Sequence, residues 1–521
     1  MATIEASAVQ TRRASGLKAS TLNLFDATVI ATSSVAPAYS LAATAFILVG
    51  VVGFASPAAI LVSFFPVLFI AMAYYYLNRR NPNCGASYSW ISSTMSPYVG
   101  WFSGWVQIAA NVLFCAAAPI VAATYTLQLL HSLFPGQISN DAVSSPFWIA
   151  VAGLLWLALV TTMVARGIRV TADFQWVMVG IEYLAIFAFA ILAFIKVATT
   201  HPAGSSGVSL SWFNPGTIFS GPGITGLVAG VALGVFFFWG WDTAANVNEE
   251  TKDASRAPGQ AGIISMFLLL FIFLLVSSAM QSLLSQDTIT KQGTNAFFYF
   301  ASQIVPAPWS YIMILAVVSS TVATVQTTLL PQSRLSFSMA RDHVFPRIFA
   351  ILHPQWQTPW VGTIIAGAIS AVLIVVQEVL SSNSSVTSVF ANLILDIGVL
   401  VGVYYGITGL ASAWAYRKML TSSASMLIFA GILPFLGGLA LLFVGFEVIS
   451  PAKSPWGTSP SWAASLPDLI LLGLGVPLTA IAALTNRSGF FKQKTIAYTR
   501  DNDIPTVAAA APVREEVGVR K

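Results

Sequence analysis

Glu182 is the one charged side chain that lies far from the end of an apolar stretch of this sequence. Placing a carboxylate within such an apolar stretch costs free energy, so we expect this side chain to have a function. Its chemistry would be ion coupling, because a buried carboxyl group can exchange a proton near neutral pH. The alternative is a structural carboxylic acid that is hydrogen-bonded to a facing hydroxyl.

Asp242 closes a run of aromatic residues and is the second candidate for chemistry. Its carboxylate could face an ammonium group, and aromatic rings attract such a cation through cation–π interactions. Asp242 could equally stabilise the start of a following half-helix. A helix cannot point consecutive rings at one cavity, so some of these rings must be lipid-facing bulk. The aromatic run consists of Phe236, Phe237, Phe238, Trp239 and Trp241.

The residue patterns that other kinds of chemistry need are missing from the sequence. The four histidines and the carboxylates are not spaced as metal ligands are. The sequence contains no phosphate-binding Gly-Lys-Ser/Thr loop and no pair of nucleophile and base that would suggest an enzyme. Cys84 and Cys115 are not expected to pair. We therefore expect no metal, no cofactor and no catalysis. The net charge of +5 is spread over loops and the tail and does not indicate nucleic-acid binding.

Glu182 and Asp242 must be positioned by the long uncharged stretches of the chain. Only 8% of the 521 residues are charged, against roughly 25% in soluble domains. No Asp, Glu, Lys or Arg occurs in residues 27–78, 81–140, 197–241 or 292–333. Each stretch holds one or two apolar segments of about 20 residues, the length that crosses a bilayer. The chain is therefore predicted to be an all-α polytopic protein in a lipid bilayer.

We expect about twelve transmembrane helices. The polar first 23 residues predict no cleavable signal, so the first helix would direct insertion. The predicted spans are residues 24–52, 57–78, 97–131, 147–165, 173–199, 224–246, 261–283, 297–330, 359–379, 387–416, 424–447 and 466–486.

The basic residues predict the orientation. With both termini cytoplasmic, 21 of the 24 Lys and Arg residues fall on the inner side, and only Lys196, Lys291 and Lys453 fall outside. This bias follows the positive-inside rule and places the protein in the plasma (inner) membrane as a multi-pass protein. The C-terminal residues 487–521 mix charges with an alanine run and are expected to be disordered.

The first and sixth predicted spans both carry helix-breaking residues. Pro37 follows Thr32, Ser33 and Ser34, and Gly240 stands between Trp239 and Trp241. A proline removes a backbone donor, and an opened helix at mid-membrane leaves backbone groups that a substrate or ion can satisfy. The alternative is a kinked but closed helix. Since five spans precede the sixth, two five-helix units would be inverted relative to each other.

Four stretches together resemble the amino acid–polyamine–organocation superfamily of permeases. They are Pro82-Asn-Cys-Gly-Ala-Ser-Tyr88 with Gly100-Trp-Phe-Ser-Gly-Trp105, Gly167-Ile-Arg-Val, Phe238-Trp-Gly-Trp-Asp242 with Glu249, Glu250, Lys252 and Pro258, and Ser333-Arg-Leu-Ser-Phe-Ser-Met-Ala-Arg-Asp342 with Pro346. The resemblance depends on their order along the chain. Two departures are Thr32-Ser33-Ser34, where the family usually has Gly-Ser/Ala-Gly, and Glu182, where many proton-coupled members have lysine.

The resemblance implies a five-plus-five inverted-repeat fold with broken first and sixth helices. The implied parts are a cytoplasmic segment 1–23, a first repeat 24–200, a second repeat 201–418, two added helices 419–486 and the tail 487–521. The implied substrate site lies between the broken helices, with Phe236 and Trp239 or Trp241 closing over it. Its residues are Thr32, Ser33, Ser34, Val35, Ala36, Pro37, Phe236, Phe238, Trp239, Gly240, Trp241 and Asp242.

The same resemblance places an ion site where the first, fifth and eighth helices meet. Glu182, Ser319, Ser320 and Thr321 would then bind a proton or Na⁺, although such a hydroxyl run can also serve helix packing. Glu249, Glu250, Arg341 and Asp342 would form a cytoplasmic gate, or else a solvated charge cluster. Asp26 is expected to cap the first helix, and Asp396 receives no role.

We thus expect a secondary transporter of amino acids or related amines that works by alternating access, driven by proton symport. An exchanger and a Na⁺-coupled carrier are the alternatives. A channel or receptor would need a filter loop or a signalling domain, and the sequence contains neither. The sequence indicates neither the particular substrate nor the oligomeric state.

Overall fold

The computed structural model describes residues 16–221, 223–381, 386–449 and 466–499. The regular elements in these ranges are helices, apart from one isolated bridge between Leu22 and Thr251. Ten helical stretches are long and apolar enough to cross a membrane, and the first of them, Leu24–Arg80, contains two of the predicted spans. The protein is therefore a multi-pass membrane protein.

The first half of the chain supplies the first interrupted helix and four long spans, α4, α6, α8 and α9. Its elements are α2 (Leu24–Val35), α3 (Pro37–Val52), η1 (Gly53–Ala55), α4 (Ser56–Arg80), α5 (Ser87–Thr94), α6 (Pro97–Leu133), α7 (Asn140–Ser144), α8 (Pro146–Arg166), α9 (Ile168–Thr200) and η2 (Leu210–Phe213).

The next part supplies the second interrupted helix. Its elements are α10 (Gly216–Ser220), α11 (Gly223–Phe237), α12 (Thr243–Asn246), η3 (Asn248–Glu250), α13 (Ala257–Leu283), α14 (Gln286–Gln292), η4 (Gly293–Asn295), α15 (Ala296–Ile304), α16 (Tyr311–Arg341), η5 (Arg347–Ala350), α17 (Trp360–Ser381) and α18 (Val386–Ala415).

The last elements flank the bundle. They are η6 (Leu420–Ser422), the π-helical turn η7 (Met426–Ile432), α19 (Leu433–Ile449), α20 (Leu466–Thr485) and η8 (Phe490–Lys492).

One predicted span has the wrong bounds. The expected helix 297–330 is two helices, because α15 ends at Ile304 and α16 begins at Tyr311. Pro306 and Pro308 lie between them, and proline lacks the N–H that a continuous helix needs. The second helix then continues to Arg341, so its charged end is Arg341 itself, one of the residues predicted to form the gate.

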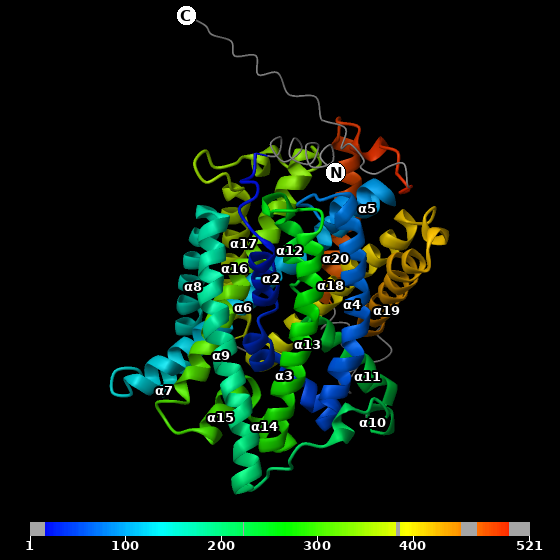
Figure 1. The fold of residues 1–521 in the computed structure, drawn as a ribbon. Helices are drawn as coiled ribbons and strands as arrows, with labels where there is room; N and C mark the ends of the chain where they lie inside the picture. The colour runs from blue at the N-terminus through cyan, green and yellow to red at the C-terminus, as the bar shows by residue number, and fades with distance from the viewer. Residues whose placement is uncertain (1–15, 222, 382–385, 450–465, 500–521) are drawn as a thin grey trace, which may run out of the picture.

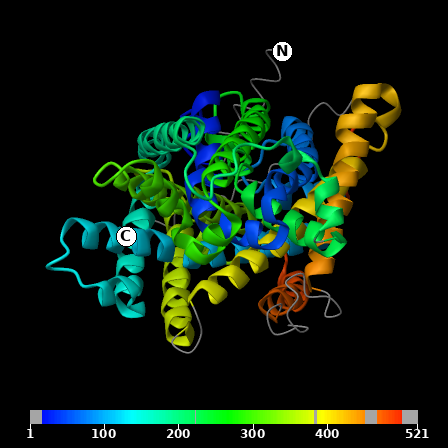
Figure 2. The same ribbon diagram turned by 90° about the horizontal axis from the view of Figure 1, so that it is seen from below.

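The helices pack in two groups that meet around the interrupted helices. In one group α13 contacts α2 and α4, and α11 contacts α3 and α4; in the other, α6, α8, α16 and α17 contact one another. α9 contacts both α13 and α16, and α18 contacts both α4 and α6, so these two helices join the groups. Viewed from below, α19 (orange) lies at the edge of the bundle, far from α8 (cyan) (Figure 2).

The two ends of the bundle carry different segments. The start of the described chain, α5 and the segment after α20 lie at the upper end in Figure 1, which we call the tail end. The short helices α7, α10, α14 and α15 lie at the lower end. Residues 487–499 were expected to be disordered with the rest of the tail, but they follow a defined path in which Tyr498 is buried. The remaining tail, residues 500–521, lies outside the described residues.

Candidate functional site

The first helix breaks at a single residue. α2 ends at Val35 and α3 begins at Pro37, and between them Ala36 has a left-handed φ of 51°. Thr32, Ser33 and Ser34, which precede Pro37, are not part of the opening, because these residues are helical and buried. The Thr32 and Ser33 hydroxyls donate to carbonyls of their own helix.

The second break is longer and depends on glycine. α11 ends at Phe237, and α12 begins only at Thr243. Gly240 between them has a φ of 116°, and a Cβ built on it would lie 2.8 Å from the Ser34 carbonyl carbon and oxygen. Only glycine fits such a close backbone approach without strain. The two breaks therefore touch, and the Ser34 hydroxyl lies 3.0 Å from the Thr243 hydroxyl.

Three tyrosines hold the Asp242 carboxylate at the second break. Tyr405 Oη donates to Asp242 Oδ1 at 2.8 Å, while Tyr404 and Tyr74 donate to Oδ2 at 3.1 and 3.4 Å. Tyr404 also accepts a hydrogen bond from the Trp239 indole at 2.7 Å. Asp242 is 3% exposed and forms no ion pair among the described residues. Among the described residues, the partners that fix this carboxylate in place are thus neutral donors.

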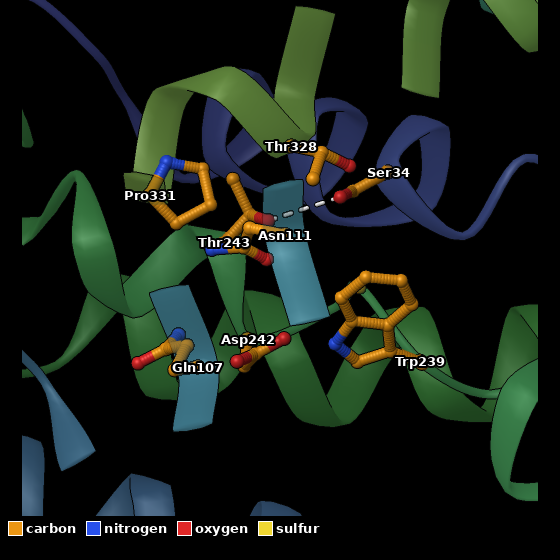
Figure 3. A pocket seen from close by; sticks show the side chains of 9 residues that line it. Ser34, Gln107, Asn111, Trp239, Asp242, Thr243, Thr328 and Pro331 are labelled. Carbon is orange, nitrogen blue, oxygen red and sulfur yellow. Dashed lines mark hydrogen bonds between the residues drawn. The ribbon is translucent and has the colours of Figure 1, made fainter. Parts of the chain in front are cut away.

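A pocket lies against this carboxylate (Figure 3). The Asp242 carboxylate and the Trp239 ring lie on one side of it and the Thr328 and Ser34 side chains on the other. The cavity measures about 10 Å³, space for a single water, so an amine or amino acid would need a wider conformation. The residues that line it are Ser34, Gln107, Asn111, Trp239, Gly240, Asp242, Thr243, Thr328 and Pro331.

The predicted substrate residues fall into two sets. Four of them, Ser34, Trp239, Gly240 and Asp242, line the pocket. The others pack around it: Phe236 and Phe238, for example, are buried against other aromatic rings. The predicted residues that do not line the pocket are Thr32, Ser33, Val35, Ala36, Pro37, Phe236, Phe238 and Trp241.

Two polar residues of α6 that complete the pocket were not predicted from the sequence. Gln107 and Asn111 are four residues apart on α6 and buried, so they share one face of that helix. That spacing of two amides in an apolar span is a signal the sequence did contain. The tyrosines around Asp242 carry no such signal, because α4 and α18 bring them together from distant parts of the chain.

Glu182 caps the start of α3 from a neighbouring helix. Its Oε1 accepts the Ala38 N–H at 2.8 Å and the Ser320 hydroxyl at 2.8 Å. Ser320 Oγ in turn accepts the Tyr39 N–H at 3.1 Å. Glu182 is fully buried, and its Oε2 has no hydrogen-bond partner among the described residues. A carboxylate from α9 thereby supplies the cap that α3 lacks locally.

Only one of the three hydroxyls expected beside Glu182 reaches it. Ser319 Oγ donates to the Ala316 carbonyl and Thr321 Oγ1 to the Val317 carbonyl, both within α16. Such bonds satisfy the hydroxyls inside an apolar helix without forming a site. Ser320 therefore remains the single α16 partner of Glu182.

The gate candidates form two separate ion pairs at the tail end. The two terminal guanidinium nitrogens of Arg341 donate to the Glu249 carboxylate, at 3.0 and 2.9 Å. Glu250 instead binds Arg334, at 2.9 and 3.1 Å, and both side chains of this pair are buried. Asp342 accepts the Tyr88 hydroxyl at 2.8 Å. Burial raises the pKa of Glu249, but the Arg341 charge outweighs burial and holds that pKa below its ordinary value.

The two remaining carboxylates lie outside the pocket. Asp26 forms a capping box with Asn23 at the start of α2, which confirms its expected role as a cap. Asp396 of α18 and Asp468 of α20 are both buried.

Comparison with known proteins identifies the family. The family model described as amino acid permease matches residues 22–476, most of the chain. The chain belongs to the amino acid permease family. This permease is accordingly a member of a transporter family, not an enzyme.

The names of individual relatives mention several different substrates. The low-affinity putrescine importer PlaP of Escherichia coli K12 is 26% identical over 65% of this chain and 72% of its own length. The branched-chain amino acid permease BcaP of Lactococcus lactis is 24% identical over 74% of this chain and 80% of its own length. The cationic amino acid transporter 5 of Arabidopsis thaliana is 25% identical, but the match covers only 55% of that protein.

Proposed function

We propose that this permease carries an organic amine without a carboxylate, by alternating access, and that Asp242 binds the amine's ammonium group. The observation that carries the proposal is the difference between the two helix breaks. One break presents a buried carboxylate without a cation, and the other has no backbone donor left for an anion.

The start of α3 is the place where a substrate carboxylate would be expected. Half-helix N-termini at such breaks bind anionic substrate groups through free N–H groups and the helix dipole. In this permease Pro37 has no N–H, Ala38 donates to Glu182 and Tyr39 donates to Ser320. The next N–H, of Ser40, donates to the Ala36 carbonyl at 2.8 Å. A carboxylate would have to displace Glu182 to bind there.

The pocket itself is suited to a cation. Its lining combines the Asp242 carboxylate and the Trp239 ring with hydroxyl and amide groups, and none of the described lining residues is Lys, Arg or His. An ammonium would gain a charge-assisted hydrogen bond and a cation–π contact from this lining. The putrescine named for PlaP is an amine of this class.

An α-amino acid is the second candidate. It is favoured by Asn111 Nδ2, a buried donor in the pocket without a hydrogen-bond partner among the described residues. That amide N–H could donate to a substrate carboxylate in place of the α3 backbone. It offers a single neutral site, which makes it a weaker anion site than a free helix N-terminus.

Glu182 would couple transport to a proton. Its bare Oε2 is the atom that would hold the proton in this closed conformation, since an uncompensated anionic oxygen is costly in a dry site. The proton and the Ala38 N–H bind the same carboxyl group, so proton binding is linked to the docking of α3. A Na⁺ ion at Oε2 is the alternative that the same geometry allows.

The positive-inside bias supports a plasma-membrane orientation with the tail end in the cytoplasm. The Arg341–Glu249 pair would then act as the cytoplasmic gate. The two breaks, in the first and sixth predicted spans, support a five-plus-five inverted repeat.

Uptake of radiolabelled putrescine into proteoliposomes tests the proposal. With an imposed inward proton gradient, the wild type should accumulate putrescine, and Glu182→Gln should lose accumulation but retain exchange across equal concentrations. Accumulation driven only by a Na⁺ gradient would replace the proton by Na⁺. A protein that exchanges amino acids but never putrescine would overturn the amine proposal.

A further inference from the structure

Residues 486–499, which follow α20, form a strap across the tail end of the permease (Figure 1). The C-terminal strap begins on the carbonyls just beyond α16. The Asn486 side chain donates to the His343 carbonyl at 2.9 Å, and Ser488 Oγ donates to the Asp342 carbonyl at 3.4 Å. Asp342 directly follows Arg341, the cation of the gate. The strap is therefore anchored beside the gate.

Two phenylalanines hold the middle of the C-terminal strap. The Phe490 ring stacks on the Tyr88 ring, with centroids 6.0 Å apart and planes 12° apart. Phe491 is buried in a cluster that includes Trp101 and Met339, and its ring lies 5.0 Å from the Tyr98 ring. The middle of the strap thus packs on α5 and the start of α6 and against the end of α16.

The far end of the C-terminal strap reaches the other helix group. The Ile496 N–H donates to the Ser93 carbonyl at 2.8 Å, and the Tyr498 N–H donates to the Ala415 carbonyl at 2.9 Å. The Tyr498 ring is 1% exposed and lies 5.1 Å from the Tyr416 ring. The guanidinium of Arg80, at the end of α4, lies 5.8 Å from the Tyr498 ring centroid.

We propose that the C-terminal strap is an autoinhibitory clamp that must leave its seat before the tail end of the permease can open. Opening at that end requires the helix group that contains α4 to separate from the group that contains α6 and α16. The Arg341–Glu249 pair lies at this division, because it joins α16 to the segment after α12. The strap spans the same division, from Asp342 and Tyr88 on one side to Arg80 on the other. Its aromatic anchors would be exposed to water on release, which favours the closed state.

Cys84 gives the permease a native reporter for this opening. Its N–H donates to Glu249 Oε1 at 3.0 Å, and the residue is fully buried beneath the gate. Burial raises the pKa of the Cys84 thiol, and the Glu249 charge raises it further, so the closed state protects it from alkylation. Cys115, the second cysteine, is buried within α6.

The test is the rate at which a charged maleimide labels Cys84 in the full-length, detergent-purified Cys115→Ala protein. A Phe491→Ala/Tyr498→Ala variant removes both buried anchors of the strap and should label at least about tenfold faster. Tyr498→Phe should label within about twofold of the wild type, because the Tyr498 hydroxyl has no hydrogen-bond partner among the described residues. Lys494→Ala is a second control, because that side chain is exposed.

A second reporter separates gate opening from general loosening. In a Cys84→Ala background, Cys115 should label equally slowly with and without the Phe491→Ala/Tyr498→Ala change. Wild-type labelling of Cys84 in the double variant would overturn the proposal. So would a parallel rise at Cys115, because the fold as a whole would then have loosened.

Discussion

The two interrupted helices satisfy their freed backbone in different ways. At the first break a single residue, Ala36, leaves the helical path, and side chains from α9 and α16 fill the exposed donors of α3. At the second break the chain is non-helical from Phe238 to Asp242, and three tyrosines surround a carboxylate. The first break is closed by the protein itself, whereas the second presents a charge to the pocket.

This difference assigns a different task to each carboxylate. Glu182 holds a helix end in place, so its protonation would act on the position of α3. Asp242 is held in place by others, so it can act on a molecule that enters the pocket. If a single buried acid performed both tasks, the substrate and the coupling ion would compete for the same carboxylate. Two acids allow both to be bound at once, as symport requires.

The largest expected effect comes from disturbing the second break through its glycine. Gly240→Ala should lower uptake by about 100-fold or more, because the new Cβ would meet the Ser34 backbone at 2.8 Å in a conformation that alanine avoids. Ala36→Gly at the first break should keep uptake within about threefold, since glycine accepts the left-handed conformation found there. Initial uptake rates in proteoliposomes measure both.

Gly473→Ala on α20 is the matched control, because a Cβ there would meet nothing within 4 Å. Equal losses in Gly240→Ala and Gly473→Ala would mean that the contact between the breaks is unimportant.

An intermediate effect is expected from the tyrosines that hold Asp242. Tyr405→Phe removes the 2.8 Å donor to a buried carboxylate and should lower the free energy of unfolding by about 1.5–3 kcal/mol. Tyr125→Phe removes a 2.6 Å bond to a neutral carbonyl and should cost only about 1 kcal/mol. Thermal or denaturant unfolding in detergent compares the two. A smaller loss in Tyr405→Phe would argue that Asp242 is not held as a charge.

The smallest expected effect is the response of the proposed gate to pH, at a position away from both helix breaks. The pKa of Glu249 lies below its ordinary value of 4.5, so its ion pair with Arg341 stabilises the closed state of the proposed gate above pH 4.5 and is lost only as pH falls further. Hydrogen exchange around η3, corrected for intrinsic rates, should stay unchanged between about pH 5 and 8. Glu249→Gln should exchange faster throughout. Gate opening in the wild type between pH 5 and 8 would contradict the Glu249 assignment.

The sequence predicted the broad fold and both break regions, and physical rules explain why. Charge-free stretches of bilayer length leave few alternatives to membrane helices, and Pro37 and Gly240 interrupt helices through local backbone effects. The exact opening was not predicted, because Thr32 and Ser33 hydroxyls bond within their own helix. The boundary between α15 and α16 was missed although Pro306 and Pro308 marked it.

The partners of each carboxylate were harder to predict. Ser320 is the one hydroxyl of the predicted run that faces Glu182, and helix rotation decides which of three neighbours does so. Tyr74, Tyr404 and Tyr405 meet Asp242 only through the packing of α4 and α18 around the second break. Glu250 paired with Arg334 instead of joining the gate, because α16 places Arg334 two turns before Arg341.

Equilibrium competition between putrescine and ornithine probes the proposed amine site at Asp242, because the two molecules differ by one carboxylate. The wild type should bind putrescine at least about tenfold more tightly than ornithine, since the donors at the start of α3 are already used. Asp242→Asn should weaken putrescine binding by about 100-fold, because the ammonium loses its counter-charge. Equal or tighter binding of ornithine, or putrescine binding unaffected by Asp242→Asn, would refute Asp242 as the amine-binding group of a carrier for amines without a carboxylate.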